Sequence, residues 1–312
     1  MHINIVKSQR IIIALLIFLF GMAFAENKPI ELLHAGTMQK VTKKPLDDLN
    51  KAENSYIMFD KDVHLKQEDV HLYADRAYQY PDLHLVRLFG NVTIHDDSVT
   101  VWFEKGEYNT KTKDIRVPVS IRILYDTRQF SAGSLTGNFD NDIYRAYGQV
   151  EIRDSLSYAL GDSLLFDLEQ ERAWLYGNAV MTDTVNNITM RGKELEYHLD
   201  SDQFFGRKDA SVYETLDDGT KRFEVFAKSL HGDMNEGWLI AEDSVYIKQD
   251  SSAAWCDSLF YLDSTQTVQL YGKVHMQYKD IDMYASAMSL NFYRNHLGEL
   301  MATENPKVTL TE

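Results

Sequence analysis

Hydrophobic and polar residues alternate along most of the chain. In the stretch SLLFDL (163–168), Leu164, Phe166 and Leu168 fall on one parity and the intervening residues on the other. This period of two is typical of a strand that buries one face. Outside the N-terminal segment there is no convincing stripe of apolar residues at helical spacing. The pattern therefore predicts an all-β protein.

The alternating runs are arranged in repeats of about 29 residues. In the motif aromatic-Gly-x-(x)-Val, the stretches YGQVEI and YGNAVM carry Gly148 and Gly177, which are 29 residues apart, and Gly206 follows after another 29. A second motif alternates with the first, as in LGDSLLF from Leu160 and CDSLFYL from Cys256. We count about eight units of two strands each, which is a strong signal of repeat architecture.

Each unit has an apolar row that it cannot bury alone, so neighbouring units must stack. The glycine before Val-x-Ile predicts a tight turn or a close backbone approach. We expect an elongated body of two facing antiparallel sheets with open sheet edges at both ends. If each unit gives one strand to each sheet, eight units at roughly 4.8 Å per strand make a body about 40 Å long.

The alternation also predicts which side chains line the space between the two sheets. The expected inward-facing residues are Val92, Ile94, Ile121, Val150, Ile152, Leu164, Phe166, Leu195, Tyr197, Val245, Ile247, Leu259, Val274, Met276, Met288 and Leu290. With 44% hydrophobic residues among 312, the chain has enough apolar surface for such a core.

The first 25 residues have the features of a secretory signal peptide. Lys7 and Arg10 precede an apolar run, and Ala23-Phe24-Ala25 supplies an A-x-A cleavage site. The apolar run is short for a membrane span, which needs about 20 residues. We expect cleavage and export to the periplasm, with a retained anchor as the alternative. Residues 26–312 are then predicted to form a single β-repeat domain.

Charge and cysteine content exclude several classes. The formal charge is −15, and loss of the signal, which carries two positive charges and no acidic residue, brings it near −17. This disfavours nucleic acid, whose phosphates require clustered Lys and Arg. Cys256 is the only cysteine, so an intrachain disulfide and a cysteine-based zinc site are both excluded.

No motif indicates catalysis, and we expect neither enzymatic activity nor a cofactor. Acidic residues recur in every unit and are interpreted as turn residues; examples are Asp97, Asp154, Asp162, Asp243 and Asp257. The densest histidines are His64, His71, His84 and His95. They lack a metal-protease or similar spacing, so surface or edge positions are expected and no metal site is assigned. Phosphate-loop, dinucleotide and serine-hydrolase fingerprints are missing.

Several stretches together resemble the OstA-like family, which comprises lipopolysaccharide-transport bridge proteins of the periplasm and the N-terminal domain of the outer-membrane lipopolysaccharide assembly protein. They are IELLHAGTMQ (30–39), YADRAYQYPD (73–82), RLFGNVTI (87–94), LGDSLLFD from Leu160 and WLYGNAV from Trp174. The resemblance implies a twisted β-jellyroll that holds the acyl chains of the glycolipid between its sheets, so that the inward-facing residues above become the lipid-binding surface.

The same resemblance implies the partners: lipopolysaccharide or a related glycolipid, the inner-membrane transporter, the outer-membrane assembly protein and, through head-to-tail contacts, other copies of the chain. Two other functions stay open. A carbohydrate-active β-solenoid enzyme would need acidic residues gathered on one external face, whereas here they are spread over all units. A structural or adhesive envelope protein would have a sealed interior.

Overall fold

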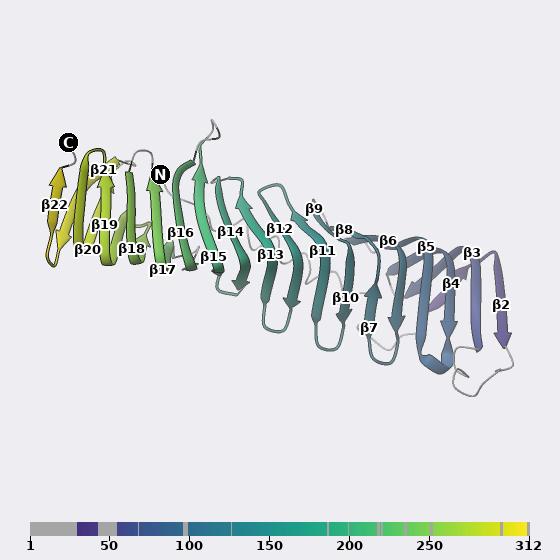
Figure 1. Cartoon of the computed structure of the whole chain (residues 1–312). Helices are drawn as coiled ribbons and strands as arrows, with labels where there is room; N and C mark the ends of the chain where they lie inside the picture. Colours follow the sequence, from purple (N-terminus) through teal and green to yellow (C-terminus); the bar gives the residue numbers. More distant parts are fainter. Residues whose placement is uncertain are drawn as a thin grey trace. The chain divides into compact units, whose positions relative to one another are not determined.

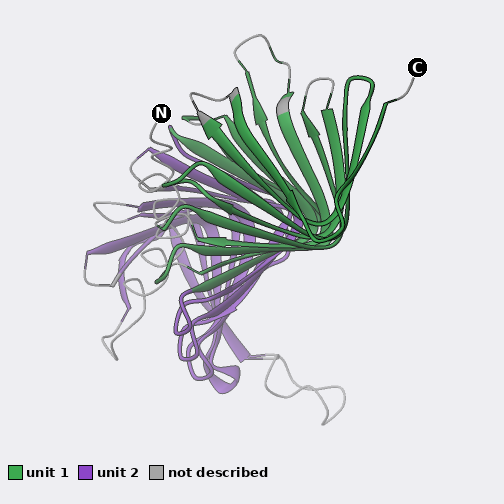
Figure 2. Ribbon diagram, turned by 90° about the vertical axis from the view of Figure 1, so that its left-hand side faces the viewer, with its two compact units in different colours: residues 1–11, 156–161, 172–312 green, residues 12–155, 162–171 purple. Residues whose placement is uncertain are grey.

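The computed structural model describes residues 30–42, 55–67, 69–95, 99–125, 127–185, 187–198, 200–216, 219, 221–233, 236–249, 252–293 and 296–310. The predicted signal peptide lies outside the described residues. The chain divides into two compact units (Figure 2). Of the described residues, unit 2 holds 30–155 and 162–171, and unit 1 holds 156–161 and 172–310.

The described part of the chain consists almost entirely of β-strands (Figure 1). Unit 2 contains β1 (Glu31–His34), β2 (Thr37–Thr42), β3 (Ser55–Gln67), β4 (Val70–Tyr80), the 3-10 turn η2 (Pro81–Leu83), β5 (Leu85–His95), β6 (Val99–Asn109), β7 (Asp114–Val117), β8 (Ile121–Tyr125), β9 (Arg128–Ala132), β10 (Ser134–Asn138) and β11 (Ile143–Arg153). β12 (Ser157–Asp167) is divided between the units.

Unit 1 contains β13 (Arg172–Asp183), β14 (Ile188–His198), β15 (Gln203–Thr215), β16 (Lys221–Asp233), β17 (Trp238–Gln249), β18 (Ser252–Leu262), β19 (Thr267–Tyr278), β20 (Ile281–Tyr293), β21 (His296–Thr303) and β22 (Lys307–Leu310). Within each unit, the long strands (β3 to β6 and β13 to β20) each pair antiparallel with the long strand that follows in sequence. The predicted all-β, antiparallel fold class is confirmed. In the described part, β3 to β20 make eight two-strand repeats when β7 with β8, and β9 with β10, each count as one interrupted strand.

The long strands bend sharply near their middle. In β13, Gly177 has a φ of 65° and Asn178 a φ of 42°, and the pairing with β14 shifts register between Tyr176 and Ala179. Two successive residues with positive φ in a strand form a bulge that redirects the backbone. The same pair of positive φ values occurs at Lys61–Asp62, Gly90–Asn91, Gly148–Gln149, Lys208–Asp209, Asp243–Ser244 and Gly272–Lys273.

These bends explain how the two layers arise. Figure 2 shows the long strands of unit 1 turning over along one line, so that each long strand runs through both layers. The expectation that each unit gives one whole strand to each sheet is therefore wrong, because the motif glycine lies in the middle of a strand and not between strands. Gly206 is not equivalent to Gly148 and Gly177, since the bend of β15 lies two residues later, at Lys208 and Asp209.

β7 to β10 depart from the long-strand pattern. Pro118 separates β7 from β8, and both segments pair with β6. Proline has no N–H to donate to the ladder, so the strand is interrupted there. In the next strand of the repeat, Gly133 separates β9 from β10. The repeat is preserved, but here each bent strand has become two short ones.

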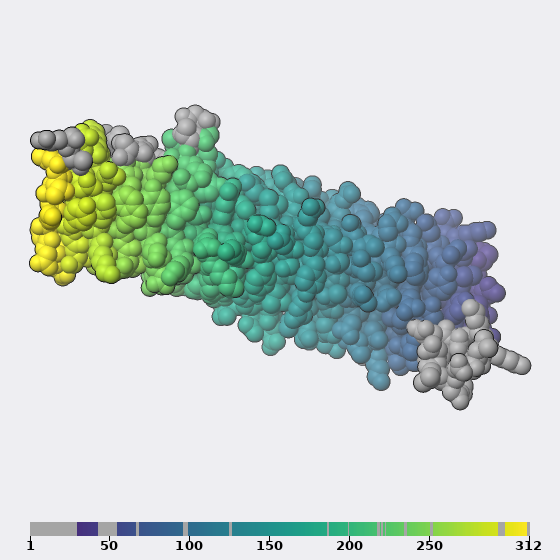
Figure 3. Space-filling model, viewed as in Figure 1, coloured from purple at the N-terminus to yellow at the C-terminus, as the bar shows by residue number. Residues whose placement is uncertain are grey.

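The core of unit 1 lies between the two halves of the bent strands. It includes residues from both sides of a bend, such as Ala241 and Val245 in β17 and Leu270 and Val274 in β19, each at most 1% exposed. On the face drawn in Figure 3, side chains cover the strands of this unit. The apolar rows thus meet inside each unit, as the alternation predicts.

Asx turns close several hairpins. The side-chain oxygen of Asn109 accepts from the backbone N–H groups of Lys111 and Thr112, both at 2.9 Å. Asn138 and Asp167 play the same part 29 and 58 residues further along the chain. Side chains of this type stabilise tight turns by replacing a backbone acceptor.

Other acidic residues predicted to lie at turns have different positions. Asp162 and Asp257 lie inside β12 and β18, and Asp243 lies at the bend of β17, so these three occupy the middle of strands. Asp154 follows β11, and Asp97 lies outside the described residues. Carboxylates therefore occur along the bends as well as in the hairpin turns.

Candidate functional site

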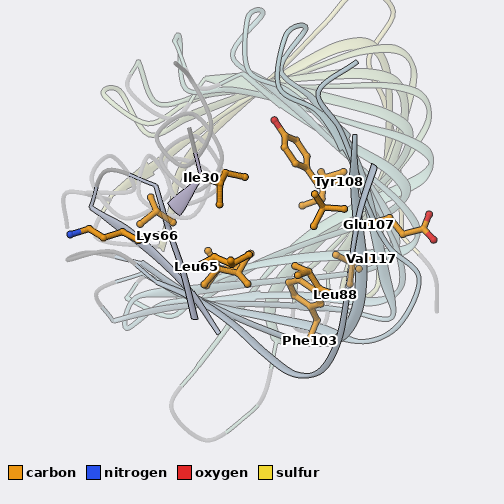
Figure 4. Close-up of a pocket in the computed structure, with 14 residues that line it drawn as sticks. Ile30, Leu65, Lys66, Leu88, Phe103, Glu107, Tyr108 and Val117 are labelled. Carbon is orange, nitrogen blue, oxygen red and sulfur yellow. The ribbon is translucent and has the colours of Figure 1, made fainter. Parts of the chain in front are cut away.

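Unit 2 encloses an apolar cavity between the halves of its sheet (Figure 4). Its walls come from β3 to β7 together with Ile30 and are lined by Ile30, Leu65, Lys66, Val70, Leu72, Val86, Leu88, Ile94, Phe103, Gly106, Glu107, Tyr108, Ile115 and Val117. Most of these residues are aliphatic or aromatic. The apolar ones reach the same space because alternate residues of adjacent strands point to the inner face, and in β6 the buried parity changes between Phe103 and Gly106. We call this space the unit 2 cavity.

The charged groups of the lining residues point away from the cavity. Figure 4 shows the ammonium group of Lys66 and the carboxylate of Glu107 directed outward. The guanidinium Nε of Arg87 donates to Oε1 of Glu107 at 3.0 Å. Burial, together with the nearby Asp140, raises the pKa of Tyr108 to about 12, so its hydroxyl stays neutral at physiological pH. A hydrocarbon chain placed between the two halves would therefore meet no buried charge from these residues.

The unit 2 cavity has a volume of about 40 Å³. This is space for only a few waters, at the roughly 10–15 Å³ that one water needs on this measure, and it is far below the roughly 300–1,000 Å³ of ligand pockets. A bulky apolar ligand would have to separate the halves of the sheet. The two halves are joined through two-residue bends. Separating them would therefore require a change of backbone conformation at these bends.

The sixteen predicted inward-facing residues all lie on the inner side. Fourteen of them are buried, and Ile94 and Ile247 are partly buried. Ile94 lines the unit 2 cavity, and Ile247 packs against the core of unit 1. Several are completely enclosed, such as Phe166 at 0% and Val150 at 1% exposure. Their contact with a lipid stays a prediction.

Most of the residues that line the unit 2 cavity were not among the predicted sixteen. Leu65, Leu72 and Leu88 belong to β3, β4 and β5, and each continues the alternation of its own strand. Phe103 ends the run Val99–Phe103, whose odd positions are buried. That alternation is visible in the sequence. Which of the inward-facing residues border the cavity depends on where the strands bend, and this could not be predicted from the sequence.

A buried ion-pair cluster lies on the outer side of unit 1. Glu196 is only 7% exposed, and its carboxylate accepts from Arg207 Nη1 and from His198 Nε2, both at 2.6 Å. Burial opposes the charged carboxylate, but the hydrogen bonds from His198 and Arg207 outweigh it and hold the pKa of Glu196 below its usual value. A carboxylate held ionised in this way is suited to a structural ion pair and not to proton donation.

Two further searches bear on function. Across the described ranges, no three His, Cys, Asp or Glu side chains are arranged as a ready-made metal site. The described residues also contain no helix that is long and apolar enough to cross a membrane.

Comparison with known proteins agrees with the resemblance seen in the sequence. The family model described as "OstA-like protein" matches residues 30–136, which include β1 to β9 and all the residues that line the unit 2 cavity. No curated protein matches the chain.

Among solved structures, the chain is similar to LptH, described as the LptA homologous periplasmic component of the conserved lipopolysaccharide transport device from Pseudomonas aeruginosa. The identity is 13%, the match covers 39% of this chain and 94% of LptH, and the TM-score is 0.36. The family match over residues 30–136 confirms the resemblance of this chain to OstA-like proteins.

Proposed function

We propose that the protein binds the acyl chains of lipopolysaccharide or a related glycolipid in the periplasm and carries them toward the outer membrane without catalysis. The observation that carries this proposal is the unit 2 cavity, an apolar space between the halves of a bent sheet within the stretch that matches OstA-like proteins. Apolar burial, at about 25 cal/mol per Å², would provide the affinity.

Because the cavity is small, a lipid chain would need a change in the structure to enter it. Hydrocarbon would enter by parting the two halves of the sheet, and the apolar residues exposed in this way would then contact the lipid. Direction would come from the partners at the two membranes, which the resemblance names as the inner-membrane transporter and the outer-membrane assembly protein. Head-to-tail association of copies belongs to the same proposal.

Photo-crosslinking in cells tests the proposal. Leu72 and Ile94 are cross-strand partners that line the unit 2 cavity, and a photo-reactive residue at either position should give adducts with lipopolysaccharide. Thr93 is the matched control, because it is also partly buried but lies on the opposite face of β5. Adducts at the inner positions and not at Thr93 support binding between the halves.

A structural or adhesive protein of the envelope is the second candidate, and the small cavity volume favours it. Its interior would stay closed, so that neither Leu72 nor Ile94 would give a lipid adduct. Absence of adducts at both inner positions, in a variant that reaches the periplasm folded, would overturn the transport proposal and leave this one.

A further inference from the structure

Four histidines from four strands gather on the outer face of unit 2. His34 is the cross-strand partner of His64, and His71 is the cross-strand partner of His95. The rings of His71 and His95 are stacked with their centroids 5.5 Å apart, and Tyr73 stacks on His64 at 4.3 Å. We call His34, His64, His71 and His95 the histidine cluster.

Two of these imidazoles, those of His64 and His71, lie within hydrogen-bond distance of each other. Nε2 of His64 lies 2.8 Å from Nδ1 of His71, so one ring donates a hydrogen bond to the other. The lone pair of the accepting nitrogen and the N–H of the donating nitrogen point at the same place. A transition-metal ion can replace the shared proton there, because imidazole nitrogen is a preferred ligand of Zn²⁺, Cu²⁺ and Ni²⁺.

We propose that His64 and His71 bind one divalent transition-metal ion through Nε2 and Nδ1. Two tetrahedral ligands at about 2.0–2.1 Å from a metal are about 3.4 Å apart, so the pair has to open by about 0.6 Å. Because no third ligand is in position within the described residues, water completes the shell or a ring of His34 or His95 turns toward the ion.

The surroundings favour a cation at this place. An open cleft of about 330 Å³ borders His64 and His34, and it is also lined by the carboxylates of Asp62 and Asp75. The cluster is on the outer face, and the inference is independent of the proposed lipid binding.

The test uses the protein purified without a polyhistidine tag. Titration with Cu²⁺, followed by paramagnetic resonance, should give one equivalent of tightly bound ion whose spectrum shows coupling to at least two nitrogens. Zn²⁺ should compete for the same site in calorimetry. His64→Gln and His71→Gln should each weaken binding at least tenfold.

His84→Gln is the matched control, because His84 follows η2 at the far end of the β4–β5 hairpin and lies apart from the cluster. An equal loss of affinity in this variant, or no bound equivalent in the unchanged protein, overturns the proposal. Should a glutamine variant fail to fold, the nitrogen coupling in the unchanged protein decides, since fewer than two nitrogens rules the pair out.

Discussion

Asp257 of β18 covers Gly272 at the bend of β19. A Cβ atom added to Gly272 would lie 2.7 Å from the Cβ of Asp257, and the backbone of the glycine has a φ of +75°. Asp75 covers Gly90 in the same way in unit 2, where Asn91 also donates to Oδ2 of Asp75 at 2.9 Å. In both places the acidic residue of the second sequence motif packs against the glycine of the first motif on the neighbouring strand.

Replacing Gly272 with alanine should destabilise unit 1. The substitution combines a left-handed backbone with a steric collision, and we expect a loss of about 2–4 kcal/mol. Urea unfolding followed by circular dichroism measures it. Gly219→Ala is the control, because Gly219 has a φ of +84° but no atom near its added Cβ. Its loss should be about 1 kcal/mol. Equal losses in the two variants would show that Asp257 contributes nothing.

The ion-pair cluster of Glu196 predicts acid sensitivity. A carboxylate whose folded-state pKa is lowered stabilises the protein above its unfolded pKa, near 4.5, and that contribution is lost as pH falls through the lower folded value. Glu196→Gln should therefore reduce the free energy of unfolding by about 2–3 kcal/mol at pH 7. The difference between the variant and the unchanged protein should shrink toward zero in acid.

Unfolding curves at pH 7 and at several values below 5 check this expectation. Glu304→Gln serves as the control, since Glu304 is exposed near the C-terminus. A difference between Glu196→Gln and the unchanged protein that stays constant down to pH 2 would mean that the ion pair does not contribute to stability.

Cys256 should be unreactive until unit 1 unfolds. Burial, with a further contribution from Asp257, raises the pKa of its thiol to about 12, and the side chain is only 6% exposed. Because the thiolate is the reactive form, maleimide should modify the native protein at least a hundredfold more slowly than the unfolded chain. Cys256 is the only cysteine, so mass spectrometry gives the extent directly. Rapid labelling in buffer would contradict the burial.

A charge inside the unit 2 cavity should abolish lipid binding. Ile94→Asp places a carboxylate among Leu72, Leu88 and Phe103, where the resulting desolvation penalty opposes hydrocarbon. Lipid recovered with the variant should fall at least tenfold. Thr93→Asp changes the neighbouring, outward-facing residue and should leave recovery within twofold. Similar recovery from both variants would place the lipid elsewhere.

The sequence was sufficient to predict the inner face. Side chains such as Val150 and Ile152 are buried because every second residue of a strand points to the same face, whatever the partner strand is. The bends could not be predicted from the same pattern. In a strand with two residues of positive φ, such as β5, the buried parity is the same on both sides of the bend (Leu88 and Val92), so this strand resembles two strands joined by a turn. Lys208 and Asp209 bend β15 without any glycine.

The histidine cluster shows the other limit. His34 and His64 are 30 positions apart in the chain, and His71 and His95 are 24 apart. Their proximity depends on strand register and on the bends that set that register, so spacing alone could not reveal it. The predicted family resemblance, in contrast, rests on local motifs and is confirmed where those motifs are densest.

The Asx turns at Asn109, Asn138 and Asp167 recur every 29 residues, so one repeat can be counted from turn to turn. An internal deletion of residues 139–167 would join Asn138 directly to Leu168, so that one turn takes the place of another. Every remaining residue would keep its face, because the deleted length equals one repeat. The deletion would shorten the sheet by two strands, or about 10 Å. Proteins of this design can therefore change their reach by gaining or losing whole hairpins, without redesign of the interior.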